Sequence, residues 1–138
     1  HTRSLCDWSS DVCSSDLCMQ AISAIDELGI SIEVIDVQTL LPFDLDHSIV
    51  KSLEKTNRLL IVDEDVSSGA TAYILEKILV EQGGYYHLDE APLTLSAKDH
   101  RPAYGTDGDY FSKPSIEDIV EKVYEIMSGA NPAAYPPL

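Results

Sequence analysis

The sequence predicts an α/β domain built on an open, mostly parallel sheet with helices on both faces, in three layers. Segments with helical and with strand-like patterns alternate along almost the whole chain of 138 residues. This alternation is typical of parallel strands joined by right-handed crossover helices. The run RLLIVD at residues 58–63 is almost entirely apolar, as expected of a strand that is covered on both faces.

The first elements are predicted from apolar spacing and from residues that begin or end a helix. Residues 19–28 carry apolar side chains at helical spacing and are followed by Gly29, so they are interpreted as the end of a helix. Residues 31–40 are rich in β-branched side chains and predict a strand. We expect Asp44 to cap a helix that runs through Thr56. The buried face of that helix is predicted to carry Leu45, Ile49 and Leu53.

The second half of the chain predicts two more helices and a third, weaker strand. The first of these helices begins at Ser67, Ser68 or Gly69 and ends at a pair of glycines, Gly83 and Gly84. The strand is expected at residues 92–97 and the last helix at residues 115–127. Ser115 and Asp118 have the spacing of a capping box, with Pro114 at or next to the cap. The Pro-rich tail at residues 129–138 is expected to be flexible.

The charge balance excludes several classes of protein. The chain has 24 acidic and 9 basic side chains, a formal net charge of −15 and a pI near 4.3. A nucleic-acid-binding protein needs clustered Lys and Arg, which are absent from this sequence. No stretch of about 18 uncharged apolar residues predicts a membrane span. Any partner recognised by charge is expected to be basic.

The N-terminal stretch does not fit the pattern of the rest. Residues 7–17, DWSSDVCSSDL, resemble a sequencing-library adapter translated in frame. We therefore expect residues 1–17 to be non-native and disordered, and the native domain to span residues 18–128. The spacing of Cys6, Cys13 and Cys18 fits neither a C-x-x-C pair nor a zinc site. Cys18 is then the one native cysteine, which favours a reducing compartment such as the cytoplasm.

Acidic residues at the end of the buried strand are the main candidate for chemistry. In parallel sheets, ligands bind outside the carboxyl ends of the strands. Such acids suggest a metal or general-base site, but capping of the next helix together with solvated acids is the favoured explanation. The Ser/Gly segment that follows matches no phosphate-binding loop. The candidate residues are Asp63, Glu64, Asp65, Ser68 and Gly69. The motifs alone therefore identify no active site.

Three ordered blocks resemble the C-terminal domain of the transketolase family. They are residues 33–44 (EVIDVQTLLPFD), residues 59–72 (an apolar strand, acids, then Ser-Ser-Gly-Ala into a helix) and residues 114–120 (PSIEDIV), preceded by Arg-Pro-Ala-Tyr at 101–104. Within that family the chain is most similar to the β part of the E1 component of thiamine-diphosphate-dependent 2-oxo acid dehydrogenases. The loop at residues 98–113 is similar to that of bacterial E1 proteins in which the α and β parts are fused.

The resemblance implies a role without catalysis in this chain. In the family, thiamine diphosphate and Mg²⁺ bind between earlier domains whose motifs are absent here, so no catalytic, cofactor-binding or metal residue is expected and the fragment should be inactive alone. The C-terminal domain instead supports subunit assembly with the rest of E1, in a homo- or hetero-oligomer, and docks the lipoyl-bearing E2 core. Asp89 and Glu90 are the candidate docking residues.

The resemblance also implies a truncated sheet. The family sheet has five strands in the spatial order 1-3-2-4-5, and the N-terminal tract takes the place of strands 1 and 2. Because strand 2 is central, we expect a fragment that folds poorly, with two open backbone ladders.

Other interpretations stay open. A transketolase or deoxyxylulose-phosphate synthase domain is a relative of the same family. A free-standing flavodoxin-like regulatory or binding domain without catalysis is the alternative from another class. The choice between pyruvate and branched-chain 2-oxo acids cannot be made, because the substrate pocket belongs to other domains.

Overall fold

A computed structural model describes residues 2–7, 14–37, 39–66, 69–97 and 114–137. Its strands are β1 (Thr2–Asp7), β2 (Ile32–Val37), β3 (Leu59–Val66) and β4 (Leu93–Ala97), and its helices are α1 (Ser14–Glu27), α2 (Ser48–Thr56), α3 (Ala70–Leu75), η1 (Glu76–Glu81), η2 (Gly84–His87) and α5 (Ile116–Ala130). The sheet has the order β2-β1-β3-β4, and each neighbouring pair is parallel. The predicted α/β class is therefore confirmed.

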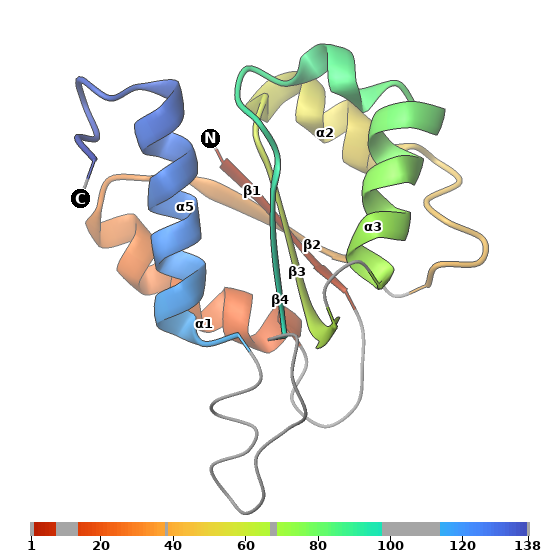
Figure 1. Ribbon diagram of the computed structural model, residues 1–138, viewed down its shortest axis with the longest axis horizontal. Helices are drawn as coiled ribbons and strands as arrows, with labels where there is room; N and C mark the ends of the chain where they lie inside the picture. The colour runs from red at the N-terminus through yellow and green to blue at the C-terminus, as the bar shows by residue number, and fades with distance from the viewer. Residues whose placement is uncertain (1, 8–13, 38, 67–68, 98–113, 138) are drawn as a thin grey trace, which may run out of the picture.

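Helices cover both faces of the sheet. Figure 1 shows α1 and α5 on one face and α2 and α3 on the other. Each face has its own cluster of buried side chains, and β3 contributes to both of them: Leu60 and Val62 pack under α1 and α5, and Leu59 and Ile61 pack under α2 and α3. These four side chains are at most 1% exposed. The apolar run was thus correctly interpreted as a strand covered on both faces.

The N-terminal residues differ from the expected disorder. Residues 2–7 form the central strand β1, paired with Ile32–Val37 on one side and, through residues 3–6, with Leu59–Val62 on the other. Helix α1 begins at Ser14, inside the expected non-native tract. The physical reason is that ladder hydrogen bonds use backbone groups, which every residue except proline supplies. The origin of residues 7–17 stays a prediction, and residues 8–13 lie outside the described part.

The position of β1 also corrects the expected open ladders. With β1 in place, both β2 and β3 have a neighbour in the middle of the sheet. The buried Cys18 on α1 is disulfide-bonded. The expected reducing compartment stays a prediction.

Helix α2 begins later than predicted, although its capping residue was identified correctly. The two carboxylate oxygens of Asp44 accept hydrogen bonds from the backbone N–H groups of Ser48 and Ile49, at 3.1 and 2.9 Å. The intervening chain is non-helical, with His47 in the left-handed region at φ 54°. Leu45 therefore does not lie on the helix, and its side chain is 75% exposed. Its predicted burial was wrong because the helix begins at Ser48, four residues after Asp44.

The next helix changes its winding partway along. It runs as α-helix through α3 and as π-helix through η1, with Ile74 and Ile78 fully buried. It ends as predicted at Gly83, whose φ of 75° is in the left-handed region that glycine adopts without a Cβ penalty. In the part of the chain that the structure describes, no helix has the length and apolar character needed to cross a membrane.

The last helix begins with the predicted capping box. The Ser115 hydroxyl accepts from the backbone N–H of Asp118, and the Asp118 carboxylate accepts from the backbone N–H of Ser115. The tail differs from the flexible segment expected at residues 129–138. It folds back on α5, where the Tyr124 hydroxyl donates to the carbonyl of Pro136 at 2.8 Å and the rings of Tyr124 and Tyr135 meet edge to face. Two aromatic rings on facing segments supply the contact that composition alone did not predict.

Candidate docking surface

The predicted docking residues lie on a turn between η2 and β4. Gly84, at the start of η2, packs closely against the preceding helix: a Cβ on Gly84 would lie 2.8 Å from the carbonyl oxygen of Ile78 and 3.2 Å from a methyl of Leu53. Only glycine fits this approach without a shift of its neighbours. The turn therefore begins from a fixed point on the layer formed by α2 and η1.

Two hydrogen bonds attach the turn to the corner between α2 and β3. The Asn57 side-chain amide donates to the carbonyl of His87 at 2.7 Å. The backbone N–H of Asp89 donates to the carbonyl of Asn57 at 2.9 Å. Asn57 can make both bonds because it ends α2 in the left-handed region, at φ 64°, a conformation in which asparagine is enriched. The hydrogen bonds of Asn57 therefore fix the backbone of the turn that carries Asp89 and Glu90.

Asp89 is paired within the chain. The Arg58 guanidinium faces its carboxylate with two contacts, Nε to Oδ1 at 3.2 Å and Nη2 to Oδ2 at 3.3 Å. The Arg58 side chain is 17% exposed and that of Asp89 is 48% exposed. A basic partner would have to compete with Arg58 for this carboxylate, since a two-point guanidinium pair is the strongest common form of such contacts.

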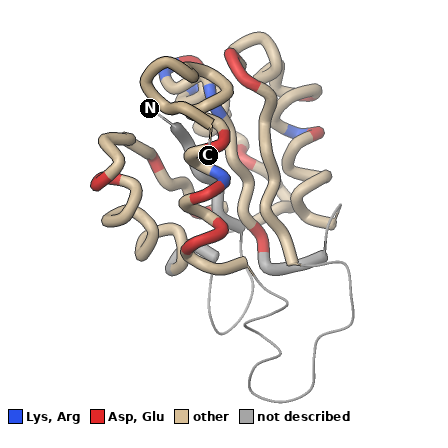
Figure 2. Tube along the Cα trace, turned by 60° about the vertical axis from the view of Figure 1, so that its left-hand side comes forward, with Lys and Arg blue, Asp and Glu red and all other residues tan. Residues whose placement is uncertain are grey.

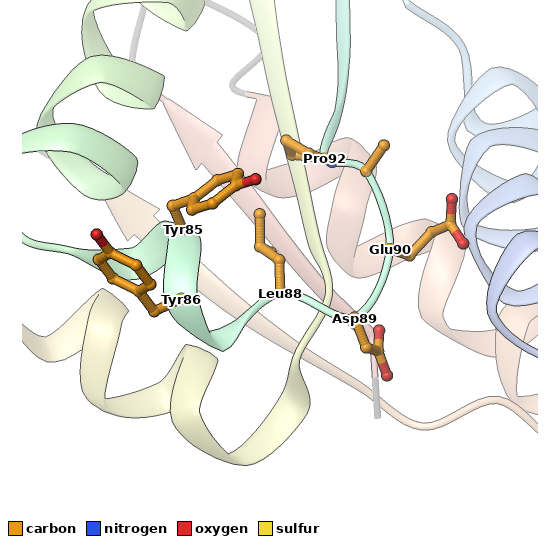
Figure 3. Close-up of a pocket in the computed structure, with 7 residues that line it drawn as sticks. Tyr85, Tyr86, Leu88, Asp89, Glu90 and Pro92 are labelled. Atoms are coloured by element: carbon orange, nitrogen blue, oxygen red, sulfur yellow. The ribbon is translucent and has the colours of Figure 1, made fainter.

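Glu90 lies against the end of α5. A Cβ built on Gly129 would lie 2.8 Å from the Glu90 carboxyl carbon, so the carboxylate packs directly over that glycine. Figure 3 shows Glu90 extending from the turn toward this helix, away from Tyr85 and Tyr86. The last turn of α5 carries no basic side chain. The C-terminal end of a helix carries a partial negative charge. The end of α5 and the Glu90 carboxylate together therefore favour the approach of a cation.

An aromatic pocket adjoins the two acids. The rings of Tyr85 and Tyr86 meet edge to face with centroids 5.8 Å apart, and these residues are 67% and 87% exposed. They help to line an open pocket of about 620 Å³ (Figure 3). The other lining residues are Leu88, Asp89, Glu90, Ala91 and Pro92. The sequence analysis missed the tyrosines; two adjacent aromatic residues in a turn-rich segment were the available signal.

The other candidate residues do not form a comparable site. Asp63 is 2% exposed, and the strand continues through Glu64 and Asp65 to Val66, so these acids lie within β3 rather than after it. Gly69 is the N-cap of α3, and as a glycine it has no side chain to cap the helix. Ser68 and the loop at 98–113 lie outside the described residues. The suggestion of a metal or general-base site at this end of β3 stays a hypothesis.

Thiamine diphosphate with Mg²⁺ would need oxygen ligands for the metal. Within the described ranges, no three His, Cys, Asp or Glu side chains are placed to hold a metal ion. No chemical step through this cofactor is assigned to the described residues.

Comparison with known proteins agrees with this fold. The family model of the transketolase C-terminal domain matches residues 12–117. The chain is 32% identical over 110 residues to the pyruvate dehydrogenase E1 component subunit beta of Mesostigma viride, covering 80% of this chain and 33% of that protein. The same subunit of Chlorokybus atmophyticus is 32% identical over 114 residues, with 83% and 33% covered.

A chloroplastic beta-3 subunit from Oryza sativa subsp. japonica is 38% identical over 81 residues, covering 59% of this chain and 20% of that protein. The chain spans about one third of the length of the two algal relatives. By fold and by family match, the chain belongs to the transketolase C-terminal domain family.

Proposed function

We propose that this chain acts as the C-terminal part of a 2-oxo acid dehydrogenase E1 β subunit and docks a basic surface of the E2 acyltransferase core. The turn with Asp89, Glu90 and the Tyr85–Tyr86 pair carries the proposal. The backbone of this turn is fixed by hydrogen bonds, its aromatic rings are exposed, and Glu90 lies beside the last turn of α5, which carries no basic side chain. Aromatic anchors beside a charged rim are what protein interfaces commonly use.

The charge of the whole chain supports a basic partner. Its formal net charge is −15, and Figure 2 shows acidic positions distributed over helices and connecting segments, with fewer basic ones. Such a surface accelerates encounter with a positively charged partner and repels acidic ones. The local contacts at the turn then decide where the partner binds.

The activity of the parent enzyme is part of this proposal. The relatives are named as subunits of pyruvate dehydrogenase, which favours pyruvate over branched-chain 2-oxo acids as the substrate. We propose that thiamine diphosphate and Mg²⁺ bind elsewhere in the parent enzyme, that this chain supports assembly with the rest of E1, and that it works in the cytoplasm. No feature of the described residues favours the flavodoxin-like alternative.

Binding to a purified pyruvate dehydrogenase E2 core tests the docking site. Titration calorimetry of the full chain at two salt concentrations is expected to show binding that weakens with salt. Glu90→Lys should weaken it by about tenfold or more, since it places a like charge against the partner. Glu117→Lys, at an exposed position on the first turn of α5, makes the same change of charge away from the turn.

Comparison of Glu90→Lys with Glu117→Lys separates docking at the turn from attraction of E2 by the net charge of the chain. Equal losses in both variants would mean that net charge, and not this turn, recruits E2. Tyr86→Ala removes an exposed ring without changing charge and should also weaken binding. Absence of binding by the unaltered chain, with circular dichroism showing a folded protein, would contradict the proposal.

A further inference from the structure

A groove lies between α5 and the C-terminal tail. Residues 131–137 turn back beside α5 (Figure 1), and the space between the helix and the tail has a volume of about 460 Å³. We call this space the tail groove. Its lining residues from α5 are three, four and seven positions apart, which places them on one side of the helix. The lining residues are Glu121, Tyr124, Glu125 and Ser128 of α5 and Pro137 of the tail.

Contacts within the chain hold the tail groove open. The Tyr124 hydroxyl donates to the carbonyl of Pro136 at 2.8 Å, and its ring meets that of Tyr135 edge to face, with centroids 6.1 Å apart. Tyr135 packs in turn against the core cluster under α1 and α5. These contacts fix the Tyr124 ring and the segment that leads to Pro137. A ligand therefore meets a preformed groove and bears less of the cost of ordering it.

The charges beside the tail groove favour a cation. Helix α5 carries four acidic side chains and one basic side chain, Lys122. Lys122 pairs with Glu125 at 3.1 Å and so neutralises that carboxylate in part. Glu121 is exposed, and among the residues whose side chains the structure describes no base lies within ion-pair distance of it. The groove thus joins an aromatic ring, a proline and an uncompensated carboxylate.

We propose that the tail groove binds an arginine side chain from an extended, basic segment of a partner protein. A guanidinium is planar, so it can stack on the Tyr124 ring while its N–H groups donate to the Glu121 carboxylate. The aliphatic part of the arginine side chain suits the surface of Pro137. A lysine ammonium is a compact point charge that cannot stack and form a two-point contact at once. The inference does not depend on the proposed E2 docking, since no residue of the turn before β4 lines this groove.

An arginine peptide tests the tail groove on the full chain. The probe is acetyl-Gly-Ala-Arg-Ala-Arg-Gly-amide, titrated at low salt into the ¹⁵N-labelled protein and followed by NMR. We expect the largest shift changes at the backbone amides of residues 121–128. The control peptide carries citrulline in place of both arginines, which keeps the planar shape without the charge. It should bind at least about fivefold more weakly, because hydrogen bonds from a charged donor to a carboxylate are the stronger kind.

Two variants of the chain locate the contacts. Glu121→Gln removes one charge at an exposed position with little change in size and should weaken binding by about fivefold. Glu76→Gln makes the same exchange at an exposed position on the opposite face of the sheet and should leave binding unchanged. Tyr124→Leu removes the ring and should weaken binding by about threefold.

Three results would overturn the proposal. The first is equal weakening by Glu121→Gln and Glu76→Gln, which would mean that the net charge of the chain, and not the groove, attracts the peptide. The second is a citrulline peptide that binds as tightly as the arginine peptide. The third is unchanged binding by Tyr124→Leu, with circular dichroism showing a folded protein. Because Glu121 is exposed, its variant keeps the test decisive even if Tyr124→Leu fails to fold.

Discussion

The two central strands of this sheet reach similar positions by different means. Strand β3 is buried because its side chains are apolar on both faces. Leu60 and Val62 pack into one core, and Leu59 and Ile61 pack into the other. Strand β1 lies beside it with the sequence TRSLCD, and its position is defined by parallel backbone ladders with β2 and β3. The comparison teaches that backbone hydrogen bonding can pair a strand whose residue pattern does not predict it, whereas the burial of apolar side chains is what makes β3 predictable from sequence.

The largest expected effect comes from removing a core side chain of β3. Ile61→Ala should lower the free energy of unfolding by about 2–5 kcal/mol, since the side chain is fully buried and leaves a cavity. Urea denaturation followed by circular dichroism measures the loss. Thr94→Ala, at an exposed position of β4, should change stability by less than about 0.5 kcal/mol. If Ile61→Ala and Thr94→Ala lowered the free energy of unfolding by similar amounts, β3 would not be packed more tightly than β4.

A smaller loss of stability is expected at Gly84, which packs against the helix layer that covers Ile61. Gly84→Ala puts a Cβ 2.8 Å from the backbone carbonyl of Ile78 and should cost about 1–3 kcal/mol through the shift it forces. Gly83→Asn is the control, because its φ is +75° and nothing lies within 4 Å of a Cβ there, a conformation that asparagine tolerates. Thermal unfolding of Gly84→Ala and Gly83→Asn measures the difference in stability. A neutral Gly84→Ala would mean that η2 moves freely and does not hold this layer over β3.

The opposite face of the sheet depends on α5 and its first turn. Ser115→Ala removes one half of the capping box and should lower stability by about 0.5–2 kcal/mol. Ser115→Asp keeps an acceptor for the backbone N–H of Asp118 and should recover part of that loss. Hydrogen exchange at residues 116–119 reports the effect locally. Unchanged exchange in Ser115→Ala would show that packing on β1 and β3, and not the cap, fixes the helix start.

The smallest effect is expected at an exposed ion pair. The hydrogen bond from Lys77 to the Glu81 carboxylate, at 2.8 Å, raises the pKa of Lys77 above its ordinary value of 10.5. A folded-state pKa above the unfolded value means that the pair stabilises the fold below pH 10.5, and that this contribution is lost as the pH rises through the folded-state pKa. The stability difference between the unaltered chain and Lys77→Met should therefore shrink at high pH.

Urea midpoints measured at neutral pH and above pH 10.5 provide the test. Glu76→Gln, a neighbouring exposed change of charge on the same helix, is the control. A difference between the unaltered chain and Lys77→Met that stays constant across this range would contradict the assignment of the ion pair.

Features that depend on a few neighbouring residues were predictable. The capping box of Ser115 and Asp118, the cap by Asp44 and the helix stop at Gly83 are each formed within about five residues of the chain, the range over which caps and turns act. The apolar run of β3 was recognisable for a similar reason, because enclosure on both faces requires every side chain in turn to be apolar.

Features that join distant segments were not predictable in the same way. Arg58 and Asp89 are 31 residues apart, and nothing in either neighbourhood indicates that they pair. The same holds for Glu90 beside Gly129 and for the tail that folds over Tyr124. The candidate residues Asp89 and Glu90 came from resemblance to a family, whereas the tyrosines beside them came from the structure.

The amino-acid sequence by itself determined the class of fold, the order of the α-helices and strands that follow β1 and the acidic character of the chain, because hydrophobic period, caps and charge are local properties of the chain. Only the tertiary structure decided which strand fills the centre of the sheet, which acid is neutralised by an arginine and which is left beside a helix end. Those outcomes depend on contacts between segments far apart in the chain. The residue pattern of β1, for example, does not predict the parallel ladders that its backbone forms with β2 and β3.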